Sequence, residues 1–161
     1  MIKKFNLLFL TLFNVGKIKY APGTFASLAT CLLFLFFINY FSISTVFFAT
    51  VIILLYSIFA INTSFESFQT NDPQEIVIDE VVGQLIPLLA IPIYDTLYPL
   101  PTMYYCFGSF ILFRFFDIIK PFPISYIDKN TDGPFGIMFD DIVAGFFSTI
   151  VLTIILFYFG G

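Results

Sequence analysis

The sequence has no histidine and no tryptophan, only two cysteines, and few charged residues. Without histidine, a phosphohistidine intermediate and imidazole metal ligands are excluded. Cys31 and Cys106 lie in the apolar runs ATCLLFLFF and YYCFGSF, without CxxC spacing. Metal-binding and nucleophilic cysteines need polar, electropositive surroundings, so we interpret both as small buried hydrophobic residues.

Charged residues make up 11% of the chain and apolar residues 59%, with a mean hydropathy of +0.97. A soluble domain usually has about 25% charged residues, so this composition predicts an integral membrane protein. We expect a single domain over residues 1–161. Seven basic residues and a net charge of -4 argue against nucleic acid as a partner.

The apolar residues fall into blocks that predict an all-α, polytopic membrane bundle of four to five apolar helices. Backbone polar groups cannot remain unpaired in lipid, and the alternation of a β-barrel is absent. The second and last blocks approach the roughly 20 residues of a spanning helix. The blocks cover residues 25–38, 43–61, 82–93, 102–116 and 142–159.

The N-terminal segment 3–13, KKFNLLFLTLF, has a basic start and a short apolar run. It is followed by NVGKIKYAPGT instead of a small-residue cleavage site, so we expect it to stay uncleaved. Its apolar side chains would lie in the headgroup boundary and its lysines among anionic lipid heads.

The distribution of charge predicts the topology. With five passes and the N-terminus inside, all seven basic residues fall on one face, which the positive-inside rule assigns to the cytoplasm. The connections on the other face carry a single charge, Asp95. Three carboxylate-bearing motifs, IVIDEVVGQ, FRFFDIIKPFP and GIMFDDIVAG, are thereby brought to the cytoplasmic face.

Each motif suggests a role. Asp79 and Glu80 are adjacent on a helix, so one could bind a cation while the other orients it, and Gly83 leaves room for a neighbouring helix. Arg114, Asp117 and Lys120 are spaced by three on a helix that we expect to end at Pro121.

The third motif follows a glycine-containing segment, residues 132–136, that we expect to form a turn. Asp140 and Asp141 would then begin the last helix, where the helix dipole stabilises negative charge. The glycines of the turn would let the backbone approach a ligand closely.

Clustered carboxylates without histidine favour a hard cation such as Mg²⁺, which prefers oxygen ligands. Metal-activated water or an aspartyl nucleophile then remains as the reactive group. In YAPGTFASLAT, Pro22, Gly23, Thr24 and Ser27 open the first apolar helix. This turn could hold a phosphate, or Thr24 could be an ordinary N-cap.

Structural explanations compete with these roles. Arg114 and Asp117 could form an interfacial salt bridge, and Asp140 and Asp141 could be a helix-start pair. A small ion or proton transporter and a noncatalytic assembly factor stay open as other function classes. Some charged residues are expected to be solvated loop residues: Asp72, Glu75, Asp128, Lys129 and Asp132.

Together, four segments spanning about residues 14–147 resemble the phosphatidylglycerophosphatase A family. APGTFASL is similar to its Pro-Gly-Thr segment and IVIDEVVGQ to its Asp-Glu-x-x-Gly segment. FRFFDIIKPFPI is similar to its Arg-x-x-Asp-x-x-Lys-Pro segment and GIMFDDIVAG to its Gly-Ile-Met-x-Asp-Asp segment. The departures are Ala26, Pro134 and Phe122, where the family usually has glycine, glycine and tryptophan.

The resemblance implies an Mg²⁺-dependent phosphatase that converts phosphatidylglycerophosphate to phosphatidylglycerol in glycerophospholipid synthesis. It further implies a multi-pass protein of the bacterial inner membrane with its site facing the cytoplasm. The expected partners are the lipid substrate and membrane lipids, and a homodimer is left open.

The resemblance also implies roles for individual residues. The expected catalytic residues are Asp79, Asp117 and Asp141, with Asp117 either a ligand or the base that aligns the attacking water. Arg114 and Lys120 would bind the substrate phosphate, assisted by Thr24 and Lys17. The expected metal ligands are Asp79, Glu80, Asp140 and Asp141, with Glu66 a weaker candidate.

Overall fold

The computed structural model describes residues 2–64, 75–131 and 133–159, and within these ranges the chain is helical and has no β-strand. This confirms the predicted all-α membrane bundle. The α-helices are α1 (Ile2–Leu10), α2 (Pro22–Phe37), α3 (Ile43–Ser64), α4 (Ile78–Leu89), α5 (Ile91–Leu97), α6 (Thr102–Ile119), α7 (Ile124–Asn130) and α8 (Gly133–Phe159), with a short 3-10 turn, η1 (Val15–Lys17), before α2.

Four segments are long and apolar enough to cross a membrane: α3, α4 with α5, α6 and α8. The apolar helix α2, with 16 residues, is shorter than the roughly 20 residues of a typical span. Large apolar side chains such as Phe36, Ile52, Phe107 and Ile150 are exposed on the outer faces. Such a surface requires lipid around it, so the chain is a membrane protein.

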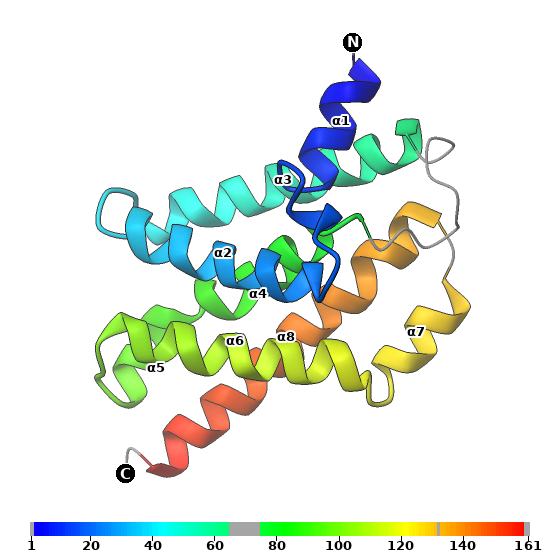
Figure 1. Cartoon of the computed structure of the whole chain (residues 1–161). Helices are drawn as coiled ribbons and strands as arrows, with labels where there is room; N and C mark the ends of the chain where they lie inside the picture. The colour runs from blue at the N-terminus through cyan, green and yellow to red at the C-terminus, as the bar shows by residue number, and fades with distance from the viewer. Residues whose placement is uncertain (1, 65–74, 132, 160–161) are drawn as a thin grey trace.

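The helices run back and forth between two ends of the molecule. The α2–α3 and α5–α6 connections and the C-terminus lie at one end, on the left in Figure 1. The beginning of α2, the end of α6 and helix α7 lie at the other end, on the right in Figure 1. The alternation of the helices therefore brings the conspicuous sequence motifs to one end, as the charge distribution predicts.

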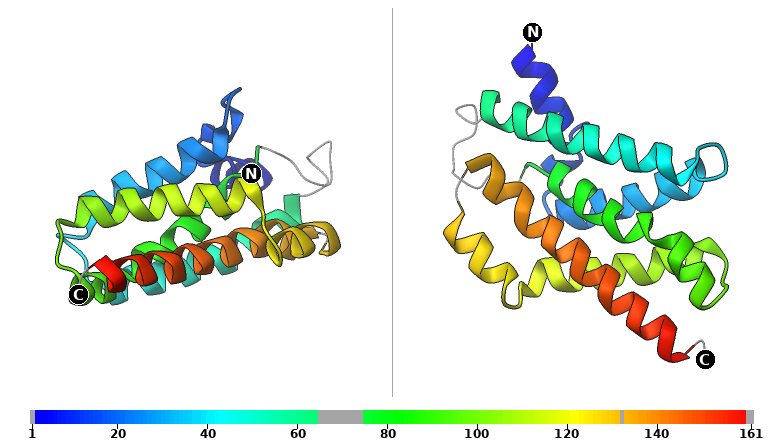
Figure 2. Two further views of the ribbon diagram at one scale, coloured as in Figure 1. Left: turned by 90° about the horizontal axis from the view of Figure 1, so that it is seen from below. Right: turned by 180° about the vertical axis from the view of Figure 1, so that it is seen from behind.

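Helix α4 lies at the centre of the bundle and contacts α2, α3, α6 and α8. It lies beside α8 in the right view of Figure 2, and this pair has the most extensive contacts of any helix pair in the described chain. Gly83 of α4 is packed against the Phe113 ring and the Asp141 backbone carbonyl, and Gly145 of α8 is packed against the Gly83 carbonyl. The prediction that Gly83 permits a close helix approach is confirmed.

A proline in α4 lies close to this contact. Pro87 lies inside α4 and has no N–H to donate to the carbonyl of Gly83, four residues earlier. The Gly83 carbonyl is therefore free of its usual helical partner at the point where Gly145 approaches it. Helix α4 ends two residues after Pro87, and α5 continues the span from Ile91.

Helix α1 packs against the bundle along one face. Asn6 is fully buried, donates to Thr63 Oγ1 at 2.8 Å and accepts from the Tyr56 hydroxyl at 2.8 Å. The rest of the helix surface exposes Phe5 together with the two lysines of the segment. The segment thus combines the expected amphipathic outer face with a specific anchor on α3.

Candidate functional site

A cavity of about 470 Å³ lies at the end of the bundle where α2 and α4 begin and α6 ends. Its volume is in the usual range of ligand pockets, but its lining is unusually rich in charge. Six carboxylates and two basic side chains line it, together with backbone of α2 and α8. The lining residues are Ala21, Pro22, Gly23, Ile76, Asp79, Glu80, Arg114, Asp117, Lys120, Asp128, Thr131, Gly133, Gly136, Ile137, Asp140 and Asp141.

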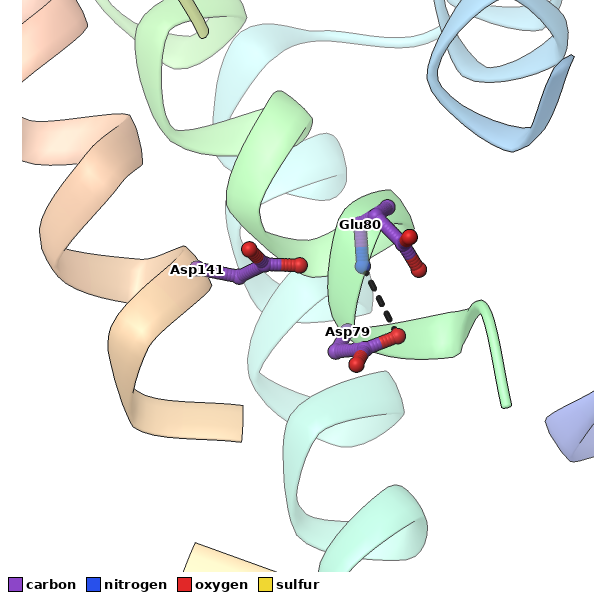
Figure 3. A group of neighbouring side chains, drawn as sticks. All are labelled: Asp79, Glu80 and Asp141. Carbon is purple, nitrogen blue, oxygen red and sulfur yellow. Dashed lines mark hydrogen bonds between the residues drawn. The ribbon is translucent and has the colours of Figure 1, made fainter. Parts of the chain in front are cut away.

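Three of these carboxylates form a compact cluster, which we call the acid trio: Asp79, Glu80 and Asp141. Figure 3 shows Asp79 and Glu80 on the first turn of α4, with Asp141 reaching across from α8. One oxygen from each lies within 4.8 Å of the others, and the Glu80 backbone N–H donates to Asp79 Oδ1 at 3.1 Å. Two carboxylates from α4 and one from α8 therefore converge on one point.

The acid trio fits a hard divalent cation. Mg²⁺ binds oxygen at about 2.0–2.1 Å, so oxygens on opposite sides of one ion lie roughly 4 Å apart, a spacing that the trio can supply. Glu80 Oε2 is buried and has no hydrogen-bond partner among the described residues. Burying this oxygen without a partner is costly, and a cation would supply the compensation.

Arg114 connects the acid trio to Asp117. Its Nη1 lies 2.7 Å from Asp117 Oδ2, one turn further along α6, and 4.0 Å from Glu80 Oε1. Nη1 is also 3.5 Å from the hydroxyl of Ser27, which donates to the Gly23 carbonyl at 2.9 Å. Arg114 Nε is buried without a partner in the described part of the chain. The guanidinium is thus fixed at one edge and retains donors for a further anion.

The neighbouring residues Asp140 and Asp141 point to different partners. Asp141 belongs to the acid trio, whereas Asp140 Oδ2 accepts from Lys120 Nζ at 2.6 Å. Adjacent residues on a helix are about 100° apart, so one side chain can face α4 and the other α7.

The prediction that these aspartates begin the last helix is wrong. Helix α8 begins at Gly133, so both lie two turns inside it, beyond the reach of the dipole at its end. At about 1.5 Å per residue, its 27 residues span about 40 Å, longer than the roughly 30 Å hydrocarbon layer. The first turns of α8 can therefore extend out of the hydrocarbon.

The described residues 133–136 are helical, not the predicted turn. Gly136 packs tightly against the carbonyl of Thr131, so its lack of a side chain serves the chain's own packing.

Lys120 lies just outside helix α6, which ends at Ile119. Its backbone is left-handed, with φ of 46°, and its N–H caps the Phe116 carbonyl at 2.9 Å. The spacing by three predicts that Arg114, Asp117 and Lys120 share one face of the helix or wrap slightly around it. Lys120 instead lies beyond the end of α6 and meets the other two only at the cavity. Burial alone would lower the pKa of Lys120, but hydrogen bonds to Asp128 and Asp140 outweigh it and raise this pKa.

Asp128 is the one charged residue of the cavity that the sequence analysis did not assign to the site. It lies on α7 and accepts a hydrogen bond from Lys120 Nζ, so the expected loop is wrong, whereas its expected exposure to solvent is confirmed. Asp128 is four residues after Ile124, which is fully buried against α6 and α8. This spacing places both on one face of α7, and it is the signal that could have indicated Asp128.

The first loop contributes backbone to the cavity. Ala21, with a left-handed φ of 48°, is the N-cap of α2 and Pro22 is its first residue, so Thr24 is not the N-cap. Neither Thr24 nor the exposed Lys17 lines the cavity, whereas Gly23 lies directly against the Glu80 carboxylate. Glu66 lies outside the described residues.

Comparisons with known proteins agree with the motifs. The family model for phosphatidylglycerophosphatase A matches residues 8–156. The chain is 35% identical to phosphatidylglycerophosphatase A of Haemophilus influenzae over 146 residues, covering 91% of this chain and 85% of that protein. Its identity to phosphatidylglycerophosphatase A of Escherichia coli is 30% over 140 residues, covering 87% and 77% of the two chains.

A third relative carries a different name. The chain is 34% identical over 146 residues to a Bacteroides thetaiotaomicron protein named as a candidate phosphatidylinositol-3-phosphatase, covering 88% of this chain and 87% of that protein. No solved structure matches the chain. Because the family model covers nearly the whole chain, including all four motifs, the protein belongs to the phosphatidylglycerophosphatase A family.

Proposed function

We propose that the protein is an Mg²⁺-dependent phosphatase that hydrolyses phosphatidylglycerophosphate to phosphatidylglycerol and inorganic phosphate. The observation that carries the proposal is the acid trio beside Arg114 and Lys120 in one cavity. Acidic residues alone would suit a cation site of any kind. The adjacent basic groups add the complement of a phosphate ester.

Asp79, Glu80 and Asp141 would hold the magnesium ion. When bound, the ion would neutralise charge on the phosphate oxygens and make a water molecule more acidic. Asp140, which was expected as a ligand, is instead engaged by Lys120. We therefore assign Asp140 to the phosphate-binding side of the cavity.

Asp117, Arg114 and Lys120 would have different roles in hydrolysis of the phosphate. Arg114 holds Asp117 through Nη1, so Asp117 stays in a fixed orientation with its second oxygen available to accept a proton from water. The guanidinium N–H groups of Arg114 that do not contact Asp117, together with the third N–H of Lys120, are donors for the phosphoryl oxygens. Catalysis would thus rest on positioning and charge, as phosphoryl transfer requires.

The position of the cavity suits a lipid headgroup at the cytoplasmic face of a bacterial inner membrane. Its lining comes from helix ends, while the apolar outer faces of the same helices are exposed as a lipid-facing surface. The seven basic residues argue for a cytoplasmic orientation of this end. Among the described acids, all except Glu75 and Asp95 line the cavity, whereas a transporter needs acids spread along a path.

Phosphate release tests this function. We expect the purified protein in detergent to release inorganic phosphate from phosphatidylglycerophosphate with Mg²⁺, and EDTA to abolish the release. Phosphatidylinositol 3-phosphate is the comparison substrate, because it is also a phosphate monoester on a lipid headgroup. Folded protein that releases no phosphate from any lipid phosphomonoester would disprove the enzymatic function, and faster turnover of the inositol lipid would change the substrate.

Arg114 gives a second test. Arg114→Lys keeps the positive charge but loses the planar guanidinium. Only the guanidinium can contact Asp117 with one group and still offer other N–H donors to a phosphate. We expect kcat/KM to fall roughly tenfold, since one charge-assisted hydrogen bond is lost in the transition state. The control is Lys129→Met, which removes an exposed charge outside the cavity and should leave kcat/KM unchanged. Equal activity of Arg114→Lys and wild type would remove Arg114 from the phosphate site.

A further inference from the structure

Lys120 is held between two carboxylates from two different helices. Its Nζ donates to Asp128 Oδ1 on α7 and to Asp140 Oδ2 on α8. An ammonium group has three N–H donors, so these two bonds leave one donor unused. Lys120 itself is only partly exposed and lines the cavity.

The fold fixes this arrangement from both directions. The left-handed backbone of Lys120 ends α6, and α7 begins at Ile124. Ile124 is fully buried in a cluster with Phe113, Phe116 and Ala144, which anchors α7 against α6 and α8. Asp128 follows one turn later, so the carboxylate that meets Lys120 stands on a helix that Ile124 anchors to the bundle.

A free lysine side chain would be a poor phosphate ligand in this cavity. Its flexible stem has considerable rotamer entropy to lose, and five other carboxylates of the cavity compete for the ammonium group. With Asp128 absent, Asp140 would be its one remaining hydrogen-bonded partner in the described structure, directly beside Asp141 of the acid trio. Asp128 provides an opposing attachment away from the trio.

We propose that Asp128 is a positioning residue, which holds the Lys120 ammonium in the cavity so that its third N–H meets the phosphate of the substrate. This inference rests on the proposed function, because it concerns the same phosphate. Asp128 acts here through Lys120 and contributes no ligand to the cation. A purely structural tie between α6 and α7 is the competing explanation.

A double-mutant cycle separates the two explanations. Asp128→Asn should weaken the binding of inorganic phosphate roughly tenfold in isothermal titration calorimetry with Mg²⁺ present, and lower kcat/KM by a similar factor. In a Lys120→Met background, Asp128→Asn should cause no further loss, because the residue acts through Lys120. Asp128→Glu, which keeps the charge, should retain more phosphate affinity than Asp128→Asn.

Two controls complete the experiment. Asp95→Asn neutralises an exposed carboxylate on α5, outside the cavity, and should bind phosphate like wild type. The Mg²⁺ concentration for half-maximal thermal stabilisation should be the same in Asp128→Asn and wild type, since the acid trio is intact.

Two outcomes would overturn the proposal. Unchanged phosphate binding in Asp128→Asn, or an equal further loss in the Lys120→Met background, would show that Asp128 does not act through Lys120 on the anion. Phosphate binding can be measured even if no lipid is hydrolysed. Failure of the positioning role and failure of the lipid phosphatase activity are therefore distinguishable.

Discussion

Asp79→Asn is expected to reduce phosphate release about a thousandfold while leaving the helical bundle folded. Asp79 supplies one of the three oxygens that converge in the acid trio, and an amide is a much weaker magnesium ligand than a carboxylate. The loss corresponds to the several kcal/mol that a bound metal contributes to charge stabilisation. Turnover of phosphatidylglycerophosphate at saturating Mg²⁺ measures it.

The thermal unfolding of the same variant checks that the loss is not a folding defect. Without metal, Asp79→Asn should unfold at or above the wild-type temperature, because it removes repulsion among carboxylates within 4.8 Å of one another. Mg²⁺ should raise the unfolding temperature of wild type and of the control Asp95→Asn, but not that of Asp79→Asn. If Asp79→Asn keeps both turnover and stabilisation by Mg²⁺, the acid trio is not the metal site.

The adjacent residues Asp140 and Asp141 of α8 provide a further test of the metal site. Asp141→Asn should behave like Asp79→Asn, since Asp141 completes the acid trio from α8. Asp140→Asn should keep the stabilisation by Mg²⁺ and lose phosphate affinity instead, because Asp140 contacts Lys120. The opposite pattern would exchange the roles of the two residues.

The sequence was sufficient to place most of the cavity residues at one end of the bundle. Long apolar runs can only be helices in lipid, and successive helices alternate in direction. Asp79 at the start of α4, Asp117 near the end of α6 and Asp141 near the start of α8 therefore lie at the same end of the bundle. This part of the prediction depends on topology alone, without any knowledge of side-chain contacts.

The sequence could not assign the partners within the cavity. Whether Asp140 or Asp141 faces α4 depends on the rotation of α8 about its axis, which the close contact of Gly145 with Gly83 determines. Asp128 was missed for a different reason. The prolines at 121 and 123 and Gly133 are turn signals, and they conceal α7 between them.

Gly145→Ala is expected to lower the activity roughly a hundredfold without changing any residue of the cavity. A Cβ at position 145 would collide with the Gly83 carbonyl and crowd the Ile86 side chain. The backbone carbonyl cannot move aside as a flexible side chain can, so α8 must shift away from α4. Displacing catalytic groups by about 1 Å can cost on the order of 100-fold in rate, and Asp141 moves with α8.

The matched substitution Gly108→Ala distinguishes this effect from a general intolerance of larger residues between helices. Gly108 on α6 also faces α8, but a Cβ there would meet only the flexible Leu152 side chain, at 3.3 Å. We expect Gly108→Ala to keep activity, and Gly145→Ala to lose both activity and the stabilisation by Mg²⁺, as Asp79→Asn does. The overpacking should also lower the stability of Gly145→Ala by about 1–3 kcal/mol, visible as a lower unfolding temperature without metal. A cation bound to oxygens from both α4 and α8 would not tolerate a change in the distance between these helices. Full activity in Gly145→Ala would therefore contradict a cation site that is shared by the two helices.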